Sequence, residues 1–112
     1  MDIMDNVDAR QRLLAGFVGM LIRTLAEKHD KQLWWGLNEN TLHIEIQYPC
    51  NAVYSGEIEI RCMSLKFKNV YLRKAPALSI SITIKDPSCI NQTSRDVYVK
   101  LLGNIIMSLL DC

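Results

Sequence analysis

The chain has 112 residues, of which 49% are hydrophobic and 22% charged, and its formal net charge is +1 at pH 7. This length fits a single domain, residues 1–112, and the apolar content is high enough to offset chain entropy, which excludes a disordered protein. The near-neutral charge excludes a global attraction to nucleic acid or to an anionic membrane. We expect residues 1–5 to form a flexible N-terminus.

The small net charge hides an asymmetry along the chain. Residues 1–63 carry six basic and nine acidic side chains, whereas residues 64–100 carry seven basic and two acidic ones. A local basic surface is therefore expected only on the second half of the chain.

The first apolar pattern predicts a helix that runs from a cap at Asp5 or Asn6 to about His29. Gly16 and Gly19 lie inside it, and each costs about 1 kcal/mol relative to alanine in a helix. Close approach of another backbone would offset that cost. The neighbour is either the sheet or second helix of the same chain, or the matching helix of a second copy, which would make a homodimer.

The middle of the chain alternates strictly between apolar and polar residues, which predicts strands with one buried and one wet face. A short aromatic segment, Leu33–Leu37, comes first, and the alternating segments Leu42–Tyr48, Glu57–Arg61, Leu65–Lys68 and Leu78–Lys85 follow it. The turn residues Asn38–Asn40 predict a hairpin between the first two. No helical pattern separates the strands, so the sheet should be antiparallel.

A final helix is expected after a cap at Thr93 or Ser94, with an apolar stripe from Val97 to Leu110. Together, these patterns predict an α+β fold with two layers. An antiparallel sheet of about four to five strands would carry one N-terminal and one C-terminal helix on the same face.

Four cysteines stand too far apart to pair as a zinc knuckle: Cys50, Cys62, Cys89 and Cys112. Cys62 continues the apolar parity of its strand and is interpreted as a small core residue. The apolar run Leu13–Ile22 follows three aspartates, which is unlike a secretory signal, and it is too short to span a bilayer. We therefore expect free thiols, a cytoplasmic or otherwise intracellular reducing location, no membrane partner, no metal and no cofactor.

The adjacent tryptophans Trp34 and Trp35 should point to opposite faces of their strand, one into the core and one onto the open face or an edge. Exposed tryptophan is typical of protein contacts. His43 and Glu45 share the wet face of the next strand. These four residues, with Gly16 and Gly19 of the first helix, form the predicted partner-binding set.

A basic segment with interleaved aromatic residues gives the alternative. Its candidate nucleic-acid contacts are Lys66, Lys68, Tyr71, Arg73 and Lys74. Basic side chains bind the phosphate backbone and aromatic rings stack on bases. Lysines on a strand also protect a sheet edge from unwanted pairing, and that interpretation stays open.

No catalytic motif is present: the sequence has no GxSxG, no HExxH and no glycine-rich phosphate loop. The pairing of His43 with Glu45 on one strand face is the only feature that supports an enzymatic hypothesis. We expect a protein without enzymatic activity and with no catalytic residues.

One spacing is similar to that of a known family. Tyr71 and Pro76 stand five residues apart, before the alternating strand Leu78–Ile84. With the order of helices and strands, this resembles RWD domains and the non-catalytic variants of ubiquitin-conjugating enzymes, whose marker is Tyr-Pro-x-x-x-Pro-Pro. Leu72 and Ala77 occupy places where that family has proline.

The resemblance extends weakly to the next turn, where Pro87 alone matches the His-Pro-Asn of the conjugating enzymes. Their catalytic cysteine has no counterpart, because Cys89 lies too early. The resemblance implies a protein-interaction module without catalysis. Taken together, the sequence predicts a small accessory or regulatory protein that binds a protein partner, a profile shared with viral inhibitors of host factors.

Overall fold

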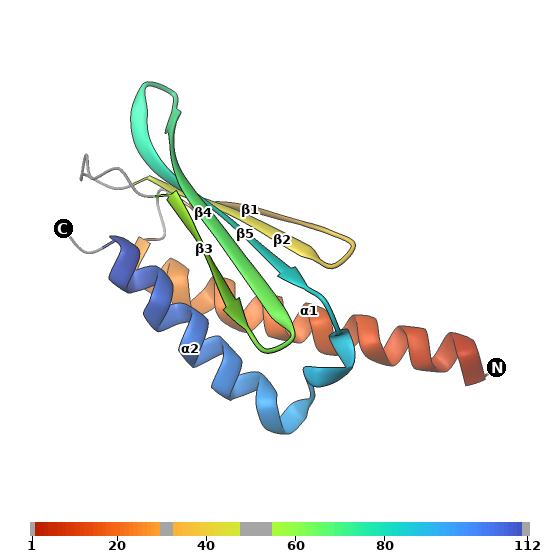
Figure 1. Ribbon diagram of the computed structural model, residues 1–112. Coiled ribbons are helices and arrows are strands. Elements are labelled where there is room, and N and C mark those ends of the chain that lie inside the picture. Colours follow the sequence, from red (N-terminus) through yellow and green to blue (C-terminus); the bar gives the residue numbers. More distant parts are fainter. Residues whose placement is uncertain (1, 30–32, 48–54, 111–112) are drawn as a thin grey trace.

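The computed structural model describes residues 2–29, 33–47 and 55–110 (Figure 1). Within them, five strands form one antiparallel sheet in the order β1-β2-β5-β4-β3, with two α-helices and a short 3-10 helix. In chain order, the elements are α1 (Asp2–His29), β1 (Leu33–Asn38), β2 (Thr41–Gln47), β3 (Ser55–Ile60), β4 (Met63–Leu72), β5 (Ala75–Ile84), η2 (Pro87–Cys89) and α2 (Gln92–Leu110).

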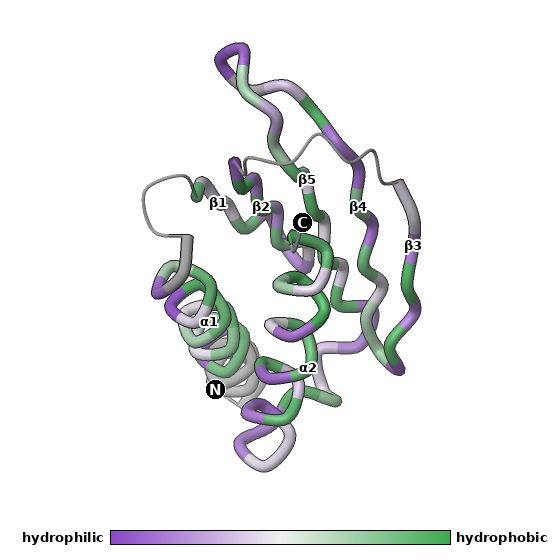
Figure 2. Tube along the Cα trace, turned by 90° about the vertical axis from the view of Figure 1, so that its left-hand side faces the viewer, coloured by the Kyte–Doolittle hydropathy of each residue, from purple (hydrophilic) through white to green (hydrophobic). Residues whose placement is uncertain are grey.

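The two helices lie side by side under one face of the sheet (Figures 1 and 2). The alternating strands turn their apolar residues toward the helices, and these side chains form the core. Its fully buried members include Phe17, Leu21, Ile44, Leu65, Ile80 and Ile82. The predicted α+β fold, with an antiparallel sheet and both helices on one face, is confirmed.

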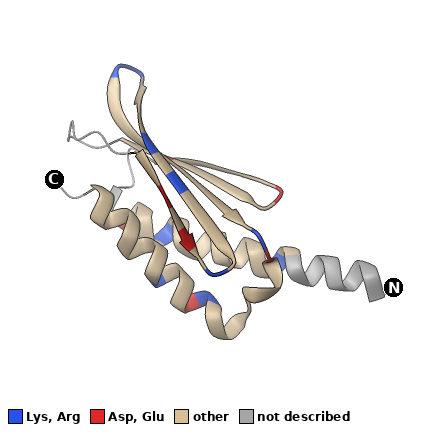
Figure 3. Cartoon of the chain, viewed as in Figure 1, with Lys and Arg blue, Asp and Glu red and all other residues tan. Residues whose placement is uncertain are grey.

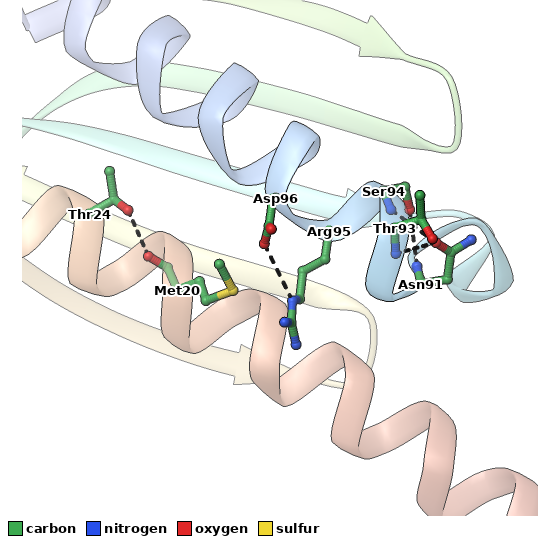
Figure 4. Close-up of polar contacts among 7 residues, drawn as sticks. All are labelled: Met20, Thr24, Asn91, Thr93, Ser94, Arg95 and Asp96. Atoms are coloured by element: carbon green, nitrogen blue, oxygen red, sulfur yellow. Dashed lines mark hydrogen bonds and ion pairs between the residues drawn. The ribbon is translucent and has the colours of Figure 1, made fainter.

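Two helix starts differ from the sequence-based expectation. Helix α1 begins at Asp2, ahead of the cap expected at Asp5 or Asn6. Helix α2 is capped by Asn91, whose Oδ1 accepts hydrogen bonds from the backbone amides of Thr93 and Ser94, each at 2.9 Å (Figure 4).

The prediction of Thr93 or Ser94 as the cap is therefore wrong by two or three residues. Ser94 has the reciprocal role, since its hydroxyl accepts a hydrogen bond from the Asn91 amide at 3.1 Å. This exchange satisfies amides at the start of α2 that have no partner within the helix.

Strands β4 and β5 form a long hairpin that extends beyond the rest of the sheet (Figure 1). Leu72 pairs with Ala75, so Arg73 and Lys74 form a two-residue turn. Both turn residues have positive φ, 53° for Arg73 and 67° for Lys74, a conformation that strains residues with a side chain.

A disulfide joins Cys62, in the turn between β3 and β4, to Cys89 of η2, with the two Cα atoms 6.6 Å apart. The expectation of free thiols is wrong for this pair. Cys62 continues the apolar parity of β3 and packs against the core, as expected, but the turn also brings it beside η2. Cys50 and Cys112 lie outside the described residues.

Candidate interaction surface

The face of the sheet that points away from the helices, here called the open face, is polar from β2 to β3 and ends on β1 with Trp34 and Gly36. Strand register arranges it in rows across the sheet. One row runs Gly36, His43, Ser81, Lys66 and Glu57, and the next runs Trp34, Glu45, Ser79, Lys68 and Ser55. Small hydroxyl side chains of β5 thus form the centre, and longer side chains stand on both sides of them.

A hollow of about 670 Å³ lies at the β1–β2 end of this face. Its position follows from Gly36, which has no side chain to fill the space between Trp34 and Asn38. A Cβ built on Gly36 would meet nothing within 4 Å. His43, Thr41 and Glu45 of β2 complete the lining. The hollow can therefore receive one large side chain beside an imidazole and a carboxylate.

Trp34 and Trp35 point to opposite faces, as expected, but neither enters the core. Trp34 pairs with Glu45 and lies half-buried on the open face. Trp35 points to the helix side yet remains 51% exposed, because β1 is the outermost strand of the sheet. The expectation of one core tryptophan is wrong, since an edge strand has a neighbour on one side only.

The Arg73 guanidinium lies over the Trp34 ring, 5.5 Å from its centroid. This contact joins one residue of the predicted partner-binding set to one of the predicted nucleic-acid set. A cation over an indole face contributes about 0.5–1 kcal/mol at an exposed site. It restrains the ring of Trp34 beside the hollow.

His43 has two polar neighbours on the open face. Its Nδ1 lies 3.2 Å from the Ser81 hydroxyl, and its Nε2 lies 3.6 Å from a Glu45 carboxylate oxygen. A serine, a histidine and a carboxylate in contact are the parts of a nucleophilic triad. Acyl transfer also needs donors for an oxyanion, and here Ser81 lies in β5, which pairs with β2 and β4 on its two sides.

The predicted nucleic-acid residues do not share one surface. Lys66 and Lys68 are exposed on the open face, opposite Glu57 and Ser55 of β3. Tyr71, which is 77% exposed, has the opposite strand parity and points to the other side of the hairpin. Figure 3 shows basic residues distributed over the sheet, its turns and the helices.

The two glycines of the predicted partner-binding set have different surroundings in α1. A Cβ on Gly16 would lie 3.2 Å from the Arg95 guanidinium of α2, so its close neighbour belongs to the same chain. Gly19 is exposed, and a Cβ there would meet nothing within 4 Å. Of the two neighbours considered for these glycines, the second helix of the same chain accounts for Gly16.

Sequence reasoning did not identify the outer edge of β1 as part of the surface. Leu37 is 39% exposed beside Trp35, and Gly36 opens the hollow on the other face. The signal was present in the composition of the strand, Leu33–Asn38, which contains no charged residue. Natural edge strands usually carry charge, proline or a bulge.

In residues 2–29, 33–47 and 55–110, no group of three His, Cys, Asp or Glu side chains is placed to hold a metal ion. Neither helix in that part of the chain combines the length and apolar character needed to cross a membrane. Comparisons with family models, with curated proteins and with solved structures find no match for this chain.

Proposed function

We propose that this chain is a non-enzymatic protein-interaction module that binds a protein partner through β1 and the adjacent part of the open face. The observation that carries the proposal is the combination of exposed apolar side chains with a hollow on one strand. Trp35 and Leu37 are 51% and 39% exposed, and Gly36 opens a hollow of about 670 Å³ between them on the other face. Exposed aromatic residues beside an unfilled pocket are typical of the centre of protein interfaces.

The His43 contacts support binding better than catalysis. Strand β5 is paired with β2 and β4, so the backbone amides around Ser81 are used in these ladders and do not form an oxyanion site. His43 and Glu45 would instead fix the polar side of the hollow and select the group that enters it. The resemblance to RWD domains remains a prediction, and Tyr71 and Pro76, which carry it, lie opposite each other on β4 and β5.

Capture from the native source with a matched pair of variants tests this proposal. Leu37→Lys places a charge on the exposed β1 surface, while Val97→Lys places one on α2, where Val97 is 64% exposed. The wild-type chain and Val97→Lys should capture the same protein, and Leu37→Lys should lose it. Equal capture by all three chains would contradict a β1 site.

One observation favours the alternative function of nucleic-acid binding. Trp34, Arg73, Lys66 and Lys68 all reach the open-face side of the sheet, where an aromatic ring and basic groups suit a single strand. Acidic side chains on β2 and β3, among them Glu45 and Glu57, flank the two lysines. Because these carboxylates repel phosphate groups, we expect the chain not to bind single-stranded RNA or DNA even at low salt. Binding that falls steeply with salt and is lost in Lys66→Glu/Lys68→Glu would favour this function instead.

An intracellular location is part of the proposal, and the Cys62–Cys89 disulfide makes it testable. Disulfides persist in oxidising compartments, whereas in the cytosol cysteines are kept as free thiols. Trapping of thiols in intact cells of the native source should find Cys62 and Cys89 reduced. A trapped disulfide would place the protein in an oxidising compartment.

A further inference from the structure

In the part of the chain that the structure describes, the outer edge of β1 presents backbone amides and carbonyls that no strand pairs with. Among the described residues, β1 pairs with β2 on one side and with no strand on the other. The strand has six residues, and none of them is a charged residue or a proline that would prevent another strand from pairing with it. Strand addition at such an edge is a common mode of protein association.

The sequence of β1 is complementary to itself in an antiparallel register. When Trp35 stands opposite Trp35 of a second copy, Leu33 stands opposite Leu37, and Trp34 stands opposite Gly36. Residues opposite each other in a ladder share a face. The apolar residues Leu33, Trp35 and Leu37 would therefore meet on the helix side, where Trp35 and Leu37 are now exposed.

On the open face, the same register places Trp34 of each copy over Gly36 of the other. Gly36 is the residue that opens the hollow, and a Cβ there meets nothing within 4 Å. A related contact lies on the helix side of the other edge, where Phe67 of the inner strand β4 stands opposite Gly56 and its ring covers the glycine. An aromatic ring over an edge glycine is thus already one of the packing solutions in this sheet.

The same symmetry fixes where the helices of the two copies would lie. A two-fold axis perpendicular to the sheet at Trp35 leaves both helical layers on the same side and brings the two α1 helices near each other. Gly16 and Thr24 of α1 face α2. From helical geometry, Ala15, Ile22 and Ala26 occupy the opposite flank, where small and apolar side chains permit close approach.

We propose that the occupant of the β1 edge is a second copy of this chain, paired antiparallel about Trp35 so that the two sheets become continuous. This inference rests on the proposed function, because it names the partner that the β1 surface binds. It also relocates self-association from the N-terminal helix, where the sequence suggested it, to the strand edge, with α1 in a supporting position.

Sedimentation equilibrium of the full chain over a wide concentration range tests the proposal. The wild-type chain should form a dimer. Gly36→Leu adds a side chain where the monomer has open space, so the fold should be kept, yet it fills the position required by the partner's Trp34. Dimer affinity should fall about 100-fold, as for loss of a central interface contact. Val97→Lys on α2 is the matched control and should dimerise like the wild type.

Cysteine cross-linking tests the register. An equimolar mixture of Leu33→Cys and Leu37→Cys chains should form a disulfide-linked dimer, and neither chain alone should exceed the wild-type background from its own cysteines. A cross-link of Leu37→Cys with itself would overturn the register centred on Trp35.

Two results would overturn the second copy as occupant. One is a monomer at every concentration. The other is a dimer that is insensitive to Gly36→Leu and lost in Gly19→Leu, which would return the interface to α1. If the chain is monomeric but still loses its captured protein in Leu37→Lys, this inference fails while the proposed function stands.

Discussion

The two edge strands of the sheet are built differently. On β3, the edge carries Glu57 and Glu59, and its glycine, Gly56, lies so close under Phe67 that a Cβ would come within 2.7 Å of the ring. On β1, no residue is charged, and its glycine, Gly36, has open space above it. One edge is protected and filled, and the other is uncharged and unfilled.

This difference explains how one small sheet can have a closed end and a binding end. The charged side chains of β3 disfavour pairing with another strand, because an added strand would bury these charges. In the oxidised chain, the adjacent turn is also tied to η2 by the Cys62–Cys89 disulfide. The β1 edge has neither feature, and its exposed apolar groups are therefore stabilised best by a partner.

The largest expected effect concerns the disulfide near the β3 edge. Replacing Cys62 and Cys89 together by alanine should lower the free energy of unfolding by about 3 kcal/mol, because the bond closes a loop of intermediate length in the unfolded chain. The sequence separation is 27 residues. Urea denaturation measures the loss, and reductant added to the wild-type chain should reproduce it. An equal stability of the oxidised, reduced and alanine forms would contradict the role of this bond.

Alanine at the two edge glycines tests the comparison itself. Gly56→Ala forces the Phe67 ring to move and should cost about 1–3 kcal/mol, as overpacking does. Gly36→Ala meets no atom and should stabilise the strand by about 0.5–1 kcal/mol, since glycine is the weaker strand former. Urea denaturation measures both changes in the free energy of unfolding, at a protein concentration low enough to exclude dimers. Similar effects of the two substitutions would show that the edges are packed alike.

A smaller effect is expected at the turn that presents Arg73 to Trp34. Lys74 has a φ of 67°, which costs a residue with a side chain about 1–2 kcal/mol relative to glycine. Lys74→Gly should therefore raise the free energy of unfolding by about 1 kcal/mol. Part of the relieved strain is offset, because glycine loses more conformational entropy on folding than lysine does. Thermal unfolding measures this gain in stability. Lys66→Gly is the control: Lys66 lies in β4 without a positive φ, so glycine there should lower the stability of the chain.

The sequence predicted those features that depend on local pattern. Alternation in Leu78–Ile84 identified the central strand β5 and its buried side, and the turn residues at Asn38–Asn40 identified the β1–β2 hairpin. The order of the strands depends on contacts between distant segments, and no local pattern encodes it. For that reason the position of β1 at an edge, and with it the exposure of Trp35, could not be predicted.

The candidate surface was predicted only in part. His43 and Glu45 were placed correctly on the wet face, because strand parity is sufficient for that. Ser81 beside His43 and Arg73 over Trp34 are cross-strand contacts, which require the register. The disulfide was missed because Cys62 and Cys89 are distant in sequence and meet only when the β3–β4 turn lies beside η2.

Amide hydrogen exchange as a function of protein concentration distinguishes a β1 edge that pairs with a second copy from one that stays unpaired. Exchange in residues 33–38 of β1 should slow as the concentration rises, because a second strand would pair with the amides on their outer edge, while exchange in residues 55–60 of β3 should stay the same. Protection that rises in β3 instead, or that changes at neither edge, would contradict pairing at the β1 edge.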